Sequence, residues 1–167
     1  ALSPDGKQLY VANEDSNVVT IIDIASRKVA GQVDVGVEPE GMAVSRDGRL
    51  VACTSETTSM AHVIDAATLE LTGNVLVDTR PRAAMFSPDG SRLFVSSEIR
   101  GTLTVIDTGT GEETGKVQFE VPGIRREGVQ AVGLAMTSDG GRLFVAMGPS
   151  NRVAEVDAGT LAVERLY

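Results

Sequence analysis

Residues 86–107 read FSPDGSRLFVSSEIRGTLTVID, and versions of this stretch occur four times along the chain. Each version opens on a turn of the Ser-Pro-Asp-Gly type, at residues 3–6, 45–48, 87–90 and 137–140. The turn glycines are spaced by 42, 42 and 50 residues. In all four copies, 18 residues separate the turn aspartate from a second aspartate, which closes a mostly apolar run. The chain is therefore built from one repeated structural unit.

Each repeat predicts four short strands joined by tight turns. A small apolar run precedes the turn, a second follows it, a third ends at the second aspartate, and a fourth is polar and alternating. Four antiparallel strands in about 40 to 45 residues are typical of a β-propeller blade. A solenoid is the alternative, although its repeats would be unusually long. We predict an all-β propeller with units at residues 1–40, 41–82, 83–131 and 132–167.

The two aspartates of each repeat are predicted to be architectural. Proline presets the backbone of the first turn, and glycine supplies the positive φ that returns the chain to the next strand. The second aspartate is followed three residues later by Ser or Thr, a pattern typical of side-chain to backbone capping. We therefore do not expect these carboxylates to be catalytic.

The first unit lacks its leading inner strand, which leaves fifteen predicted strands in four blades. We expect the chain to be part of a larger propeller of about seven blades, although a closed four-bladed ring is an alternative. In isolation, such a fragment would expose sheet edges and is expected to self-associate.

Composition narrows the range of partners. The chain of 167 residues has a formal net charge of -8, so nucleic acid and membrane surfaces are not expected to bind. Cys53 is the only cysteine and is predicted to be a buried small hydrophobe. No secretion signal is apparent at the N-terminus.

The strand at residues 10–13, Tyr-Val-Ala-Asn, resembles the YVTN family of β-propeller repeats. Other stretches resemble the β-propeller proteins associated with pyrroloquinoline-quinone (PQQ)-dependent catabolism: residues 37–44, 55–62, 95–98, 119–123 and 147–153. The resemblance implies a periplasmic or secreted protein that accompanies quinoprotein alcohol dehydrogenases and their cytochromes. It implies no activity of the chain itself.

Charged residues are predicted to gather on the propeller face where two sets of loops meet. Three glutamates, one per blade, follow the turn aspartate by nine residues, and charged pairs flank two prolines. A longer insertion at residues 118–131 departs from the repeat on the same face. The candidate residues for binding a polar ligand or protein partner are Glu14, Glu38, Glu40, Glu56, Arg80, Arg82, Glu98, Arg125 and Arg126. The alternative is that these charges only pair between blades.

No catalytic or metal-binding motif is apparent. Convergence of Glu14, Glu56 and Glu98 would suit a hard cation, but no Asp-rich calcium loop accompanies them, so we predict no metal site. His62 is the only histidine and is predicted to be structural, with a haem-ligand or general-base role as the alternative.

We therefore predict a non-enzymatic binding or scaffold propeller that holds no cofactor. The alternatives are a haem-binding or enzymatic propeller whose active residues lie partly in other blades, and a sugar- or peptide-binding module.

Overall fold

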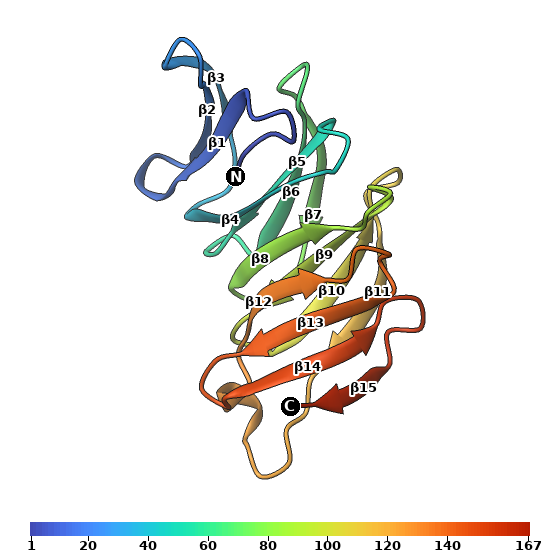
Figure 1. The fold of residues 1–167 in the computed structure, drawn as a ribbon. Helices are drawn as coiled ribbons and strands as arrows, with labels where there is room; N and C mark the ends of the chain where they lie inside the picture. The colour runs from blue at the N-terminus through green and yellow to red at the C-terminus, as the bar shows by residue number, and fades with distance from the viewer.

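The computed structural model describes all 167 residues as fifteen short strands and two single 3-10 turns (Figure 1). The strands form four antiparallel sheets, and within each sheet neighbouring strands follow one another in sequence. The first sheet contains β1 (Gln8–Asn13), β2 (Val18–Asp23) and β3 (Lys28–Asp34), and the second contains β4 (Pro39–Val44), β5 (Leu50–Ser55), β6 (Met60–Asp65) and β7 (Leu71–Leu76). The third contains β8 (Pro81–Phe86), β9 (Arg92–Ser97), β10 (Thr102–Asp107) and β11 (Glu113–Gln118), and the fourth contains β12 (Ala131–Met136), β13 (Arg142–Met147), β14 (Arg152–Asp157) and β15 (Val163–Leu166). The 3-10 turns are η1 (Glu14–Ser16) and η2 (Arg126–Gly128).

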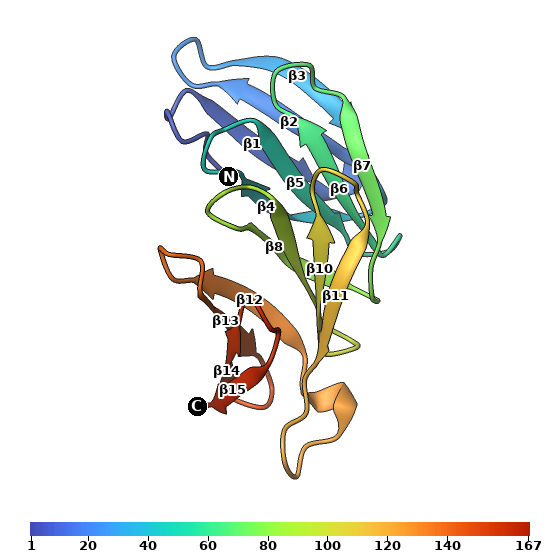
Figure 2. The same cartoon turned by 90° about the vertical axis from the view of Figure 1, so that its right-hand side faces the viewer.

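The four sheets are successive blades of a β-propeller. Their inner strands β4, β8 and β12 lie beside one another, and the blades stack face to face along an open arc (Figures 1 and 2). The first and fourth blades lie at opposite ends of this arc, so the chain does not form a closed four-bladed ring. The predicted propeller fold, with a first blade that has three strands, is confirmed. In that blade Leu2 forms a bridge to Leu9 along the free edge of β1.

The hydrophobic core consists of three clusters, one between each pair of neighbouring blades. Strand β5 shows how they form. Val51 and Cys53 belong to the cluster shared with the first blade, whereas Ala52 between them belongs to the cluster shared with the third. Because successive side chains of a strand point to opposite faces, a blade between two neighbours must be apolar on both. Burial of Cys53 raises the pKa of its thiol to about 12, as expected of a buried small hydrophobe.

The repeat aspartates stabilise turns, as predicted. Asp89 accepts hydrogen bonds from the Ser87 hydroxyl at 2.5 Å and the Ser91 amide at 3.1 Å. These bonds favour the ionised carboxylate and lower the pKa of Asp89 to about 2. At the strand ends, Asp65 accepts from the Thr68 amide at 2.8 Å, and Asp107 accepts from the Thr110 amide at 2.8 Å. Both sets of carboxylates are therefore architectural.

Candidate functional site

The loops on one face are joined by backbone hydrogen bonds that recur from blade to blade. The Glu56 amide donates to the Glu38 carbonyl at 2.9 Å, and the Glu98 amide donates to the Arg80 carbonyl at 2.9 Å. Glu38, Arg80 and the equivalent Gln130 all adopt a left-handed backbone, with φ of 58°, 62° and 46°. The linker before each inner strand is thus held against the loop between the second and third strands of the same blade.

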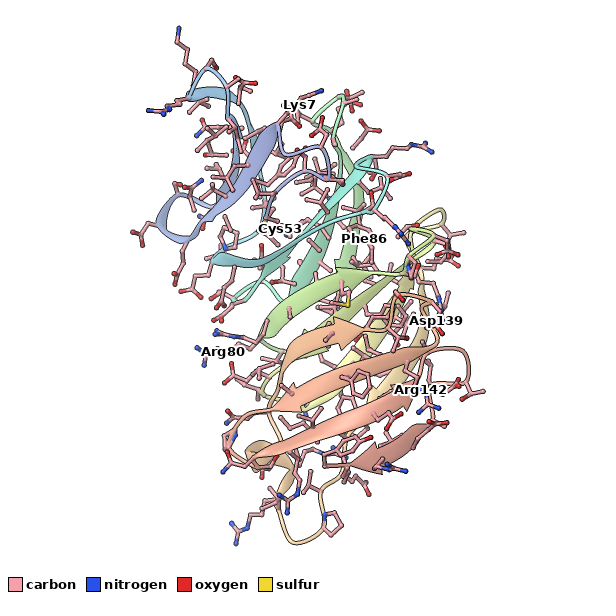
Figure 3. The ribbon with its side chains drawn as sticks, in the orientation of Figure 1. Lys7, Cys53, Arg80, Phe86, Asp139 and Arg142 are labelled. Carbon is pink, nitrogen blue, oxygen red and sulfur yellow. The ribbon has the colours of Figure 1, made fainter.

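Five charged side chains from the second and third blades meet at this junction. The Arg80 Nε lies 3.0 Å from Glu56 and 3.4 Å from Glu98. Arg82, on β8, contacts Glu40 at 2.8 Å, Glu98 at 3.6 Å, and also Glu56. We call these five residues the rim network. Arg80 lies at the edge of the structure in Figure 3.

The rim network remains accessible to a binding partner. The side chain of Arg80 is 46% exposed and that of Arg82 is 31% exposed, whereas Glu56 is only 14% exposed. An exposed ion pair typically contributes less than about 1 kcal/mol to folding stability. The ion pairs of the exposed Arg80 are therefore expected to add little to folding stability, and its guanidinium group can be reached from solvent.

Glycine at position 41 allows the strands that carry the rim network to approach. A Cβ atom at Gly41 would lie 2.1 Å from the backbone carbonyl oxygen of Arg82. The Gly41 amide also donates to the Thr54 hydroxyl at 2.8 Å. Strands β4 and β8 can therefore lie close together, which brings Glu40 within reach of Arg82.

Glu40 has an unusual protonation equilibrium. Burial, followed by a hydrogen bond with Glu56, raises the pKa of Glu40 to about 7, while Arg82 opposes the shift. Burial raises the pKa of Glu56, but hydrogen bonds with Glu40 and Arg82 outweigh this effect, so the pKa is lowered overall. Glu40 is therefore the carboxyl group of this pair that titrates near neutral pH, and the charge of the rim network changes there.

The remaining predicted site residues do not join the network. Glu14 lies in η1 and forms no ion pair, and Glu38 accepts a hydrogen bond from the Thr57 hydroxyl. Arg125 and Arg126 lie in the insertion, where neither forms an ion pair. The structure thus brings together five of the nine candidates. No group of acidic, histidine or cysteine side chains has the arrangement of a metal site.

His62 lies on β6, and both of its ring nitrogens are engaged. The Gly36 amide donates to Nε2 at 3.0 Å, and the Ser55 hydroxyl lies 3.1 Å from the same nitrogen. Since Nε2 accepts, Nδ1 carries the proton and donates to the Asn74 side-chain oxygen at 2.6 Å. The residue is 4% exposed, and burial lowers the pKa of its imidazole. His62 therefore links the second blade to the linker that leads from the first.

Two polar features were not predicted from the sequence. Glu155 is 4% exposed, pairs with Arg142 (labelled in Figure 3), and accepts a hydrogen bond from the Tyr167 hydroxyl at 2.5 Å. The available signal was its position two residues before the closing aspartate of the repeat, where the other three copies have Ile21, Val63 and Val105. Ser97 and Thr104 in the third blade have buried hydroxyl groups without any hydrogen-bond partner. No local pattern indicated these two.

Comparison with known proteins places the chain among propellers. Hydrazine synthase subunit beta of Kuenenia stuttgartiensis is 43% identical over 44 residues, which cover 26% of this chain and 11% of that protein. A solved structure of Kuenenia stuttgartiensis hydrazine synthase superposes with a TM-score of 0.90 and 24% identity. That likeness establishes the fold and covers 99% of this chain but 47% of the matched chain. The chain thus spans less than half the length of either protein.

The fold contains no helix with the length and apolar character that a bilayer crossing requires. The family described as the cytochrome D1 heme domain, which consists of β-propellers, matches residues 1–84. That match covers half of the chain and includes its first two blades. This chain belongs to the cytochrome D1 heme domain family.

Proposed function

We propose that this chain is a non-catalytic binding module of a multi-subunit assembly, and that it contacts a protein partner through the rim network. The observation that carries the proposal is the accessible pair Arg80 and Arg82, held among three glutamates by the paired loops. Charged groups at an interface rim set orientation and association rate by complementing a partner's charges. One matched relative is itself named as the subunit of an enzyme, which supports an assembly role.

The family description raises the question of haem, and neither the only histidine nor the only cysteine of this chain fits an iron-ligating role. Both nitrogens of His62 are hydrogen-bonded within the interface between two blades. Cys53 is buried with a raised thiol pKa, and Met42, Met85 and Met136 pack against the interblade clusters. No imidazole or thiolate is presented at an open position, so we derive no step through haem.

The narrower assignment, an accessory role in quinoprotein alcohol oxidation, rests only on the resemblance of short sequence stretches. It remains a prediction, as does the periplasmic or secreted location. The identity of the partner would test both. A quinoprotein dehydrogenase or its cytochrome would support the narrower assignment, and any other partner would overturn it.

A co-purification experiment with matched variants tests the binding role. The tagged protein, expressed in its native host, should elute from size-exclusion chromatography in a complex whose partner is identified by mass spectrometry. Arg82→Glu should weaken binding to the purified partner at least tenfold, because it reverses one charge among three carboxylates. Arg27→Glu, an equal charge change at an exposed arginine without an ion pair in the turn between β2 and β3, is the control and should leave the affinity unchanged.

Salt dependence provides a second readout. The affinity of wild type should fall as ionic strength rises from about 0.05 to 0.5 M, because exposed charges are screened. The proposal is wrong if Arg82→Glu and Arg27→Glu bind the partner equally well, or if wild type elutes free at low salt.

A further inference from the structure

The insertion between the third and fourth blades builds a feature that the other blade junctions lack. Four residues connect β3 to β4 (35–38) and β7 to β8 (77–80), whereas twelve connect β11 to β12 (119–130). In Figures 1 and 2 this segment extends beyond the end of β11, at the same end of the molecule as β15. The additional residues therefore lie where the outer parts of two blades meet.

A cavity of about 470 Å³ lies between the insertion and β15. Phe119, Val121 and Val129 form its apolar wall, with exposed fractions of 1%, 6% and 1%. The same three side chains belong to the hydrophobic cluster between the third and fourth blades, and Leu166 packs against that cluster. The remaining lining residues are Glu120, Pro122, Ile124 and Arg126. The cavity is thus formed wholly within this chain, and its size falls in the range of small-molecule sites.

The backbone of the insertion is ordered by its own hydrogen bonds. The Ile124 amide donates to the Val121 carbonyl at 3.0 Å, and the Val129 amide donates to the Arg126 carbonyl at 3.1 Å. Gly101, in the loop between β9 and β10, also supports the segment. A Cβ atom at Gly101 would lie 3.1 Å from Val129, so glycine lets this loop pack against the cavity wall. The cavity is thus largely preformed, which lowers the entropic cost of binding.

The charges at the cavity indicate what it binds. Arg126 lines the cavity, and its guanidinium group has neither an ion pair nor a hydrogen bond within the chain. Glu120 also lines the cavity and also lacks an ion pair. An unpaired guanidinium beside an apolar wall suits a molecule with one carboxylate, while the nearby carboxylate of Glu120 disfavours a second negative charge.

We infer that this cavity binds a compact apolar molecule that carries a single carboxylate, with its apolar body against Phe119 and Val129 and its carboxylate on Arg126. This site is separate from the rim network and does not depend on the function proposed above. Its failure and the failure of the binding role can therefore be distinguished.

Three naphthalene compounds that differ only in the head group test the inference. Naphthaleneacetate, naphthalenemethanol and naphthalenemethylamine carry a negative, a neutral and a positive group. Because the chain contains no tryptophan, their fluorescence anisotropy can be followed with little protein background. We expect the acetate to bind about tenfold more tightly than the alcohol, since a hydrogen bond to a charged group adds about that much affinity. The amine should bind most weakly.

Two neighbouring arginines provide a matched pair of variants. Arg126→Gln should weaken acetate binding about tenfold and leave alcohol binding unchanged. Arg125→Gln makes the same change one residue away, outside the cavity lining, and should leave both unchanged. Arg126→Lys should restore most of the acetate affinity, and Glu120→Gln should strengthen it.

The head-group series on wild type needs no variant, so the inference can be tested even if a variant fails to fold, which a thermal melt would reveal. Equal affinity for the acetate and the alcohol, or tightest binding of the amine, overturns the inference. An equal loss in Arg125→Gln and Arg126→Gln also overturns it.

Discussion

Replacing His62 with alanine distinguishes a structural histidine from an iron ligand. The substitution removes an imidazole that is 4% exposed and deletes its contacts with the Gly36 amide, the Asn74 side chain and the Ser55 hydroxyl. All three partners lie in or beside the interface between the first two blades. We therefore expect the cost to appear in the stability of this interface.

The magnitude follows from the contacts that are lost. Each hydrogen bond contributes about 1 kcal/mol, and a buried partner left unsatisfied costs about 1 to 3 kcal/mol. The vacated ring volume adds a cavity cost, although water entering the polar site offsets part of it. We expect His62→Ala to lower the free energy of unfolding by about 3 to 4 kcal/mol, which is large for a single substitution.

Urea denaturation followed by far-ultraviolet circular dichroism measures this change, and the third blade offers a control. Thr104 stands at the strand position equivalent to His62, but its hydroxyl has no partner. Thr104→Val should therefore cost less than about 1 kcal/mol. If His62→Ala costs no more than Thr104→Val, the structural interpretation of His62 is wrong. Loss of a Soret absorption band in His62→Ala, with stability unchanged, would instead favour an iron ligand.

The pH dependence of stability provides a second test of His62, because the direction of the change is predicted. Burial lowers the pKa of His62 in the folded state below its ordinary value of 6.5. Between the folded pKa and 6.5, the unfolded chain binds more protons at this position than the folded chain does. The stability contributed by the neutral, buried imidazole is therefore fully present above about pH 6.5 and is lost as pH falls. His62→Ala should remove this acid-side slope.

Three further predictions concern the hydroxyl groups of two threonines and two residues of the inner strand β4. Thr104→Val should leave stability unchanged or raise it slightly, because the Thr104 hydroxyl has no partner. Thr20→Val should cost about 1 kcal/mol or more, because the Thr20 hydroxyl accepts hydrogen bonds from two amide side chains. A larger loss of stability in Thr104→Val than in Thr20→Val, measured by urea denaturation, would contradict this prediction. Gly41→Ala should destabilise the chain by more than about 2 kcal/mol, because the new methyl group meets the Arg82 carbonyl; an unchanged melting temperature would show that β4 can move away. The raised pKa of Glu40, about 7, means that the folded chain binds more protons than the unfolded chain between pH 4.5 and 7. Stability should therefore fall as pH rises through that window, and Glu40→Gln should remove the slope; a slope that persists would contradict the assignment.

The fold could be read from the sequence because its signals are local and repeated. The turn at Ser87 and the strand end at Asp107 each depend on neighbours within a few residues, so one repeat explains the others. Burial of Cys53 followed for the same reason, since a strand between two blades is apolar on both faces. The unpaired hydroxyl of Thr104 could not be read in this way, because it depends on which side chains the neighbouring blade presents.

The contacts of the rim network could be predicted only in part from the sequence. Periodicity aligns Glu38 with Arg80 and Glu40 with Arg82, one blade apart, so two equivalent positions change from acidic to basic between the second and third blades. The sequence therefore predicts charges of both signs on one face, but not that Arg82 reaches back to Glu56 of the preceding blade. That contact depends on the close approach of β4 and β8, which a single glycine at position 41 permits. A charge reversal between aligned positions, together with glycine in the inner strand, is thus the pattern that would locate such a network in another propeller sequence.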